Sequence, residues 1–569
     1  MKKVMIFFAA LLLVQCAPTA KSKLKTLITD YQSFKAFDYD EFPLGEYSEE
    51  RFEKQYSFYR DCFDRAQKIK TSELSDDELR SLRLLRFVLK HRIKSHEFKM
   101  HYNPILSDEG FHNSLIYRVR KVVDKKGAIQ YLKLLKSIPL YIEQNTELIR
   151  KGIEMGISQP RVIFNGYENS YEQHITEDAS SNYYFEPFLN LPDQLSIQEK
   201  DSLQNAAKEV IEQQLIPTFL VIKSFFEKEY YPKTRTAIGV SETPNGIDFY
   251  NNRIAYYTTL DLTAEEVHQM GLDEVQRIRT EMQKIIDELE FKGSFADFLA
   301  FLRTDEQFYA KSPKELLMFA RDVAKRLDEQ LPRFFKTLPR KPYGVVPVPD
   351  AIAPKYTGGR YIGTAPNSTD PGYYWVNTYN LPSRPLYTIP ALTAHEAVPG
   401  HHLQGALNAE LPISIPQFRR NLYLSAYGEG WGLYTESLAE EMGIYTTPYE
   451  RFGQLTYSMW RACRLVVDTG MHAFGWTREQ AVDYMAENTA LSLHEVNTEI
   501  DRYISWPGQA LAYKVGELKI RELRQKAEED LGELFDIRAF HEVILANGTL
   551  TLPMLETEIN NFIDSYSSS

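Results

Sequence analysis

Cysteine is scarce in this chain. Only three of its 569 residues are cysteines, namely Cys16, Cys62 and Cys463. Small secreted proteins without a sufficient core rely on several disulfide bonds, and three cysteines cannot supply such a framework. The fold must therefore depend on its apolar core, for which 43% hydrophobic residues are ample. The sequence leaves open whether Cys62 and Cys463 pair.

The chain also lacks a basic excess and the common nucleophile motifs. Its formal net charge is −12, spread along the sequence and not gathered into a block. A nucleic-acid surface needs a stripe of Lys and Arg, so no nucleic-acid partner is expected. There is no G-x-S-x-G segment and no cysteine with a paired histidine motif, which argues against a serine or cysteine hydrolase.

Long hydrophobic runs are absent beyond the first residues, MKKVMIFFAALLLVQCAPTAKSK. Two lysines followed by about a dozen apolar residues are typical of a secretory signal and too short for a permanent membrane helix. LLVQC resembles the bacterial lipobox, in which Cys16 carries the lipid, although Gln15 replaces the usual small residue. We expect export to the cell envelope and a membrane contact only through this lipid anchor. Simple cleavage and release is the alternative. Ala17 is not the aspartate that retains lipoproteins at the inner membrane, which favours the periplasm and outer membrane.

The remaining chain is mostly helical by its periodicity. Stretches such as SDDELRSLRLLRFVLKHRI and TAEEVHQMGLDEVQRIRTEMQKIIDELEF repeat apolar residues every three or four positions. Between about 340 and 390, Gly, Pro, β-branched and aromatic residues predict strands and turns, notably GGRYIGTA and GYYWVNTY. The predicted fold class is mainly α, with a small β-sheet directly before a histidine-rich segment. The predicted organisation is a signal (1–16), a tether and entry segment (17–44), and one large helical domain (45–569) with an N-terminal helical part (45–230) and a catalytic part (231–569).

The histidine-rich segment, HEAVPGHHLQG at 395–405, resembles a stretched zinc-protease motif. The usual H-E-x-x-H sets two ligand histidines one helical turn apart. In a straight helix, His401 would point about 120° away from His395, and His402 would lie about 10 Å further along the axis. Neither could share a zinc ion with His395, because zinc–nitrogen bonds measure about 2.0–2.1 Å. A straight helix is therefore excluded for a metal site.

Pro399 and Gly400 offer a way around this geometry. Proline removes a backbone donor and glycine tolerates unusual dihedrals, so a bulge inside the helix can bring His401 back beside His395. We prefer His401 to His402 as the second ligand; the other would contact substrate or support the site. Glu396 would be the general base, taking a proton from the attacking water and passing it to the leaving amine. The alternative is a surface helix with three solvated histidines.

A third ligand is expected from NLYLSAYGEGWGLYTESLAEEMG, which begins at Asn421. A catalytic zinc takes three protein ligands and keeps one open position. Glu429 and Glu436 are seven residues apart and lie on nearly one helix face. Glycines around Glu429 each cost about 1 kcal/mol relative to alanine, which indicates close packing against the histidine helix. We expect Glu429 as ligand and Glu436 as the residue that orients a histidine. Two exposed helix glutamates are the alternative.

HEAVPGHHLQ, GEGWGLYTE and RYISWPGQALAYKVG together resemble the bacterial domain-of-unknown-function family 885. The resemblance runs through most of the chain. It implies a relation to helical gluzincin metallopeptidases, the group of neurolysin, angiotensin-converting enzyme and carboxypeptidase Taq, and hence a gluzincin-like fold. Those enzymes pair H-E-x-x-H with a glutamate on a following helix, and carboxypeptidase Taq has a second glutamate seven residues later. The two extra residues between Glu396 and His401 depart from that pattern.

The same resemblance implies a tyrosine near the metal, donated by a late helix to stabilise an oxyanion. Tyr503 and Tyr513 are the candidates, and we prefer Tyr513, which follows the Trp-Pro-Gly-Gln turn. Tyr503, Arg502, Gln509 and Asn377 are candidates for binding substrate.

These residues predict a zinc-dependent peptidase with one Zn²⁺ per chain. Two histidines and a carboxylate suit zinc well. Short peptides are expected as substrates, because helical folds of this group enclose their site in a deep channel; this step is an analogy of fold. Two alternatives stay open: a metal-dependent hydrolase of another amide, ester or cell-wall fragment, and a catalytically inactive peptide-binding lipoprotein.

Overall fold

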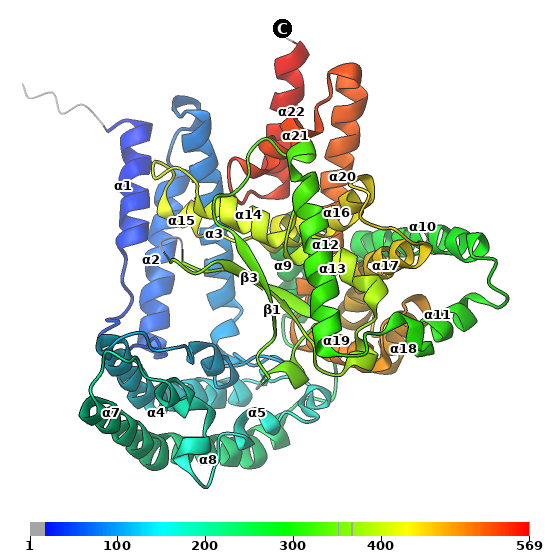
Figure 1. Ribbon diagram of the computed structural model, residues 1–569. Coiled ribbons are helices and arrows are strands. Elements are labelled where there is room, and N and C mark those ends of the chain that lie inside the picture. The colour runs from blue at the N-terminus through cyan, green and yellow to red at the C-terminus, as the bar shows by residue number, and fades with distance from the viewer. Residues whose placement is uncertain (1–17, 351, 366–367, 568–569) are drawn as a thin grey trace, which may run out of the picture.

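The computed structural model describes residues 18–350, 352–365 and 368–567, and helices dominate it (Figure 1). The predicted signal and Cys16 lie outside the described residues. Among the helices of the described part, none is both long and apolar enough to span a bilayer. The N-terminal helices are α1 (Ala20–Ser33), α2 (Glu49–Gln67), α3 (Asp76–Glu97), α4 (Lys125–Glu154), α5 (Asn169–Glu172), α6 (Glu186–Leu189), α7 (Ile197–Val210) and α8 (Ile216–Phe225).

The later helices precede and follow a small sheet, which lies near the centre of Figure 1. Before the sheet come α9 (Gly246–Thr258), α10 (Ala264–Glu288), α11 (Phe295–Thr304) and α12 (Pro313–Phe334). After it come α13 (Ile389–Glu396), α14 (His401–Ala409), α15 (Gln417–Arg420), α16 (Ser425–Glu441), α17 (Pro448–Ala473), α18 (Arg478–Asn488), α19 (Leu493–Ser505), α20 (Ala512–Leu531), α21 (Ile537–Leu545) and α22 (Leu552–Ser567).

The helices predicted from periodicity begin at the expected caps. The Ser75 side chain accepts from the Glu78 backbone, and the Glu78 side chain accepts from the Ser75 backbone, which starts α3 with a capping box. Thr263 and Glu266 do the same for α10. The predicted mainly helical class is confirmed.

The expected tether is wrong in part. Residues 20–33 form α1, whose Leu24 and Leu27 are buried against α2 and α3. The three helices stand together in blue in Figure 1. Apolar residues spaced three apart, with Thr19 as cap, supply the helical signal that the polar composition of this segment concealed.

The predicted small sheet is confirmed, and it has three strands among the described residues. They are β1 (Tyr343–Pro347), β2 (Gly359–Ile362) and β3 (Gly372–Val376), in the order β1-β3-β2. β1 runs parallel to β3, and β2 pairs antiparallel with it, Tyr361 lying opposite Tyr374. β2 is therefore an edge strand, and its free side faces α13.

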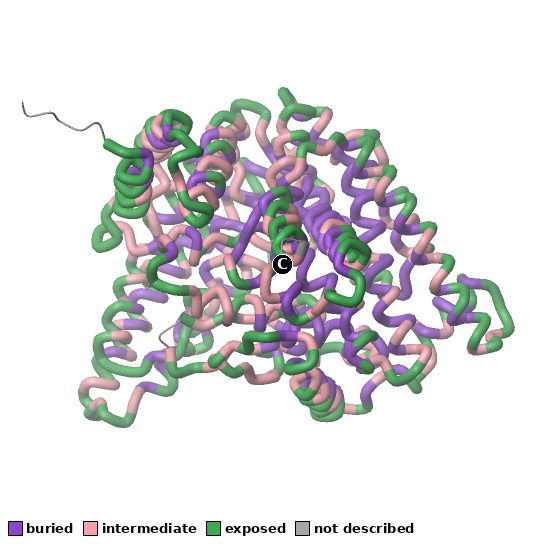
Figure 2. The backbone as a smooth tube through the Cα atoms, turned by 90° about the horizontal axis from the view of Figure 1, so that it is seen from above, coloured by how far each residue is buried: buried purple, intermediate pink, exposed green. Residues whose placement is uncertain are grey.

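Buried backbone runs through the middle of the molecule while exposed segments lie outside (Figure 2). The long helix α17 is buried along most of its length and packs along α10. Helices α16 and α20 pack closely, because Gly430 and Gly516 face each other. Cys463 in α17 and Cys62 in α2 are both buried and free, so they do not form a disulfide.

Candidate metal centre

The histidine segment does not form a single bulged helix. α13 ends at Glu396, residues 397–400 form a turn with a cis peptide before Pro399, and α14 starts at His401. The Gly400 backbone N–H donates to the Ala394 carbonyl at 3.0 Å. A Cβ on Gly400 would lie only 1.9 Å from the His395 carbonyl oxygen, so this fold-back needs glycine. The predicted bulge is thus wrong in detail: the helix ends and restarts.

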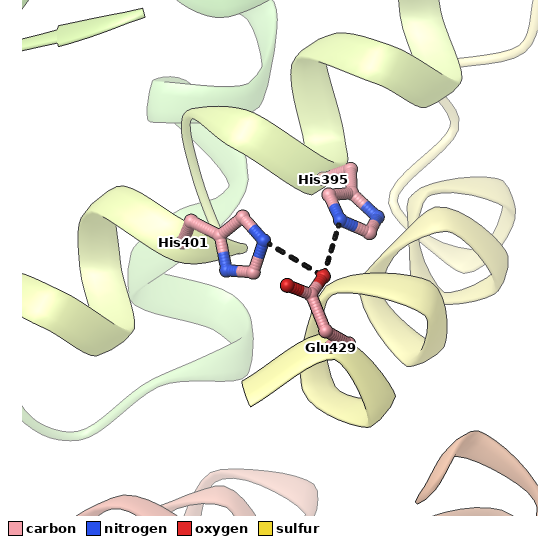
Figure 3. A group of neighbouring side chains, drawn as sticks. All are labelled: His395, His401 and Glu429. Atoms are coloured by element: carbon pink, nitrogen blue, oxygen red, sulfur yellow. Dashed lines mark ion pairs between the residues drawn. The ribbon is translucent and has the colours of Figure 1, made fainter. Parts of the chain in front are cut away.

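The turn nevertheless brings His401 beside His395, and Glu429 of α16 completes the group (Figure 3). The Glu429 Oε2 atom lies 3.5 Å from His395 Nε2 and 3.2 Å from His401 Nε2. One donor atom of each residue lies within 4.8 Å of the others. Three separate helices therefore converge on one point.

This group fits a zinc ion. Two donors held tetrahedrally at about 2.0–2.1 Å from one ion lie roughly 3.4 Å apart, close to the two observed separations of 3.5 and 3.2 Å. Two imidazoles and a carboxylate are also the donor types that zinc prefers. The neighbouring His401 and His395 hold the pKa of Glu429 well below its usual value although burial opposes its ionisation, so Glu429 is a carboxylate.

Glu436 fixes the orientation of the first histidine. Its Oε1 atom lies 2.8 Å from His395 Nδ1 and 3.3 Å from Arg461 Nη2, and its side chain is fully buried. The Nδ1 atom is thus occupied, which leaves Nε2 to face the group, as carboxylates do for ligand histidines. Although burial lowers it, hydrogen bonds to Glu429 and Glu436 raise the pKa of His395 to about 9 in the metal-free protein.

The three glycines of α16 each make room for a different neighbour. A Cβ on Gly432 would lie 2.7 Å from His395 Cε1, and one on Gly430 would lie 2.5 Å from the Gly516 carbonyl carbon of α20. A Cβ on Gly428 would lie 2.3 Å from the ring of Tyr423. The predicted close packing of this helix against the histidine helix is confirmed at Gly432.

Glu396 lies next to His395 and lines the adjoining cavity. Its Oε2 atom accepts a 2.8 Å hydrogen bond from the Tyr361 backbone N–H on the free side of β2. His402, the alternate second ligand, points elsewhere: its Nδ1 lies 3.3 Å from the Tyr361 hydroxyl, and its ring packs 4.7 Å from that of Tyr343. Burial lowers the pKa of His402 to about 4.

A cavity of about 1430 Å³ opens beside the group. Its walls come from the segment 107–183 of the N-terminal part and from later elements, and they include Arg502, Gln509 and Tyr513 of the predicted set. Arg502 donates to Gln509 Oε1 at 2.8 Å. The Tyr513 hydroxyl has no hydrogen-bond partner among the described residues, and its ring lies 4.3 Å from the Arg464 guanidinium carbon.

Two predicted substrate-binding residues are not part of this wall. Tyr503 is buried behind it, where its hydroxyl donates to Glu499 and accepts from Trp460 and Arg464. Asn377 is fully buried, and its amide donates to three carbonyls of the loop before β2, at Ala353, Tyr356 and Thr357. Their polar groups are already paired within the fold, so both expectations are corrected.

Tyr423 is a candidate residue that the sequence reasoning missed. Its hydroxyl donates to Glu429 Oε1 at 2.8 Å, and its side chain is half exposed to the cavity. Gly428 carried the signal, because its missing side chain provides the space for this ring. Arg461 and Arg464 of α17 were likewise missed, since nothing in the local sequence distinguishes them from surface arginines.

The fold and the site define a mainly helical protein with a candidate metal centre beside a large cavity. The chain belongs to the family described as "Bacterial protein of unknown function (DUF885)", which it matches over residues 35–559. This match confirms the family resemblance seen in the sequence. No curated protein matches the chain.

Two solved structures share the fold. The crystal structure of the "putative lipoprotein" from Colwellia psychrerythraea is 27% identical, with a TM-score of 0.87, covering 96% of this chain and 100% of that one. The structure of a "putative lipoprotein of unknown function" from Shewanella oneidensis is 18% identical, with a TM-score of 0.66, covering 95% and 99%. The second likeness concerns the fold alone.

Proposed function

We propose that this protein is a zinc-dependent peptidase that hydrolyses short peptides in its central cavity. The observation that carries the proposal is the convergence of His395, His401 and Glu429, with Glu396 beside them on the cavity wall. His395, His401 and Glu429 would hold the ion. When bound, zinc supplies a Lewis acid that polarises a carbonyl and lowers the pKa of water.

Glu396 acts as the general base. It takes a proton from the attacking water and delivers it to the leaving amine. The Tyr361 backbone N–H holds one carboxylate oxygen, Oε2, at 2.8 Å. Oε1 has no hydrogen bond within the described part of the chain, so it is available for this transfer.

Tyr513 is the preferred oxyanion donor. Its hydroxyl is free of hydrogen bonds within the described residues, whereas that of Tyr423 is engaged by Glu429. Donors aimed at the developing negative charge contribute most when they need not break another bond first. Tyr423 instead supports the position of the Glu429 carboxylate.

The volume and the position of the cavity restrict the class of substrate. A cavity of about 1430 Å³ walled by two parts of the chain suits a short peptide better than a folded protein. The relation to gluzincin peptidases that the family resemblance implies supports the same substrate class by analogy. We infer that the protein is exported and anchored by a lipid at Cys16; the solved structure that is 27% identical to this chain is described as a "putative lipoprotein".

The test is a peptide library digested by zinc-loaded wild type and by Glu396→Gln, with products identified by mass spectrometry. The expected result is cleavage by wild type, a loss of at least about 100-fold in the variant, and equal zinc content in both. Equal cleavage by the two proteins would contradict the mechanism. Zinc binding without cleavage of any peptide would contradict the peptidase assignment and favour a non-peptide amide or ester as substrate.

A further inference from the structure

The cavity wall contributed by α17 carries a buried arginine with an unused donor. Arg464 is 2% exposed and lines the cavity. Its Nε donates to the Tyr503 hydroxyl at 2.6 Å and its Nη2 to Glu499 at 3.0 Å, but its Nη1 has no hydrogen-bond partner among the residues that the structure describes. A buried charged donor without a partner is costly, and each such group in a folded protein needs a reason, among which a functional role at a site is one.

Nearby aromatic rings hold this guanidinium in place. Its carbon atom lies 4.3 Å from the ring centroids of both Trp460 and Tyr513. Planar guanidinium groups stack on aromatic faces and recognise carboxylates with their forked donors. Arg464 is therefore a fixed site, in contrast to a mobile surface arginine.

Glu499 and Glu495, two acidic side chains on this wall, do not pair with the Nη1 donor of Arg464. Glu499 is shared, because it also accepts from Arg502 at 3.0 Å and from the Tyr503 hydroxyl at 2.6 Å. Glu495 lines the same wall but forms no ion pair in the described part of the chain, and burial raises its pKa. The wall thus keeps a cationic donor that an anionic ligand would satisfy.

We propose that Arg464 binds the free α-carboxylate of the peptide substrate, which would make the enzyme act from the C-terminal end. This inference rests on the proposed peptidase function. Tyr513 contacts Arg464 and is the proposed oxyanion donor. This contact places a carboxylate bound by Arg464 next to the proposed oxyanion donor, so only a few residues separate it from the scissile carbonyl. The products would be short fragments released from the C-terminus.

The test compares peptides that end in a free carboxylate with the same peptides ending in a carboxamide. Zinc-loaded wild type should favour the acid by about 10- to 100-fold in kcat/KM, as expected for a hydrogen bond to a charged group. Arg464→Gln should abolish this preference. Arg384→Gln, which removes a different arginine from the same cavity, should retain it.

Calorimetric binding of both peptides to zinc-loaded Glu396→Gln separates this inference from the proposed function. Tighter binding of the acid without turnover in wild type would contradict the peptidase function and keep the Arg464 assignment. Equal binding and equal cleavage of acid and amide would overturn the assignment, even if Arg464→Gln fails to fold. A third peptide, amidated but with a C-terminal glutamate, should behave as the amide; if it behaves as the acid, a side-chain carboxylate is the ligand and the end assignment is wrong.

Discussion

Replacing Gly432 by alanine should disrupt the metal centre through a single methyl group. The added Cβ would lie 2.7 Å from Cε1 and 2.8 Å from Nε2 of His395. Unbonded carbon atoms prefer about 3.5–4.0 Å, so the overlap is roughly 1 Å. The ring cannot easily retreat, because its Nδ1 is held by Glu436 at 2.8 Å and the residue is 2% exposed.

The expected loss of zinc affinity follows from the cost of overpacking. Such a clash typically costs about 1–3 kcal/mol. This cost applies in full when zinc holds the ring in place. Zinc affinity should therefore fall by about 5- to 150-fold. Without zinc, only Glu436 and the surrounding packing restrain the ring, so part of the overlap can be relieved, and alanine regains up to about 1 kcal/mol of helix propensity. The free energy of unfolding without zinc should therefore change less than the zinc affinity.

The matched control is Gly405→Ala in α14. There the added Cβ would meet the Tyr361 ring at 3.4 Å, an ordinary contact, so zinc affinity should stay unchanged. Competition with a chromophoric zinc chelator gives the affinities, and urea unfolding of the metal-free proteins gives the stabilities. Wild-type zinc affinity in Gly432→Ala would refute the packing argument and the position of His395 at the ion.

Three further predictions follow from neighbouring contacts. Glu436→Gln, which removes the charge that orients His395, should weaken zinc binding by about 10- to 100-fold; unchanged affinity in the same chelator assay would contradict its role. Tyr513→Phe should lower kcat by about 100- to 1000-fold with zinc content unchanged, and an unaltered kcat would move the oxyanion role elsewhere. Burial raises the pKa of Asp468 from 3.8 to about 7. Between about pH 4 and 7 the folded state therefore keeps a proton that the unfolded state has lost, and the free energy of unfolding falls as the pH rises. The free energy of unfolding of Asp468→Asn should therefore rise relative to that of wild type by about 1.4 kcal/mol for each pH unit in that window. Urea unfolding across this pH range measures the difference, and a constant difference would contradict the buried, protonated carboxyl.

Much of the fold could be predicted from local patterns. The capped helices at 76–97 and 264–288 and the sheet before residue 395 follow from periodicity, capping residues and β-branched or aromatic runs. The group formed by His395, His401 and Glu429 could be anticipated from donor chemistry and glycine spacing. Each of these signals is local, because it lies within a few residues of the position that it predicts.

What could not be predicted depends on contacts between distant segments. The unpaired donor of Arg464 exists because α19 and α20 pack on α17, and no local pattern specifies that arrangement. The sequence does not show that the polar groups of Asn377 and Tyr503 are paired with distant residues in the fold and so do not line the cavity. The sequence predicts a bulge where the structure has the turn at 397–400. Pro399 indicates that the helix is interrupted, but it does not indicate how the next helix begins.

The most direct test of the metal centre is the zinc content of wild type, His401→Ala and His402→Ala, purified without chelator or histidine tag. Elemental mass spectrometry should find about one zinc per chain in wild type and in His402→Ala, and almost none in His401→Ala. The turn directs His401 into the metal group and His402 toward Tyr361 and Tyr343. Absence of zinc from wild type after loading and dialysis, or its loss only with His402, would contradict the account.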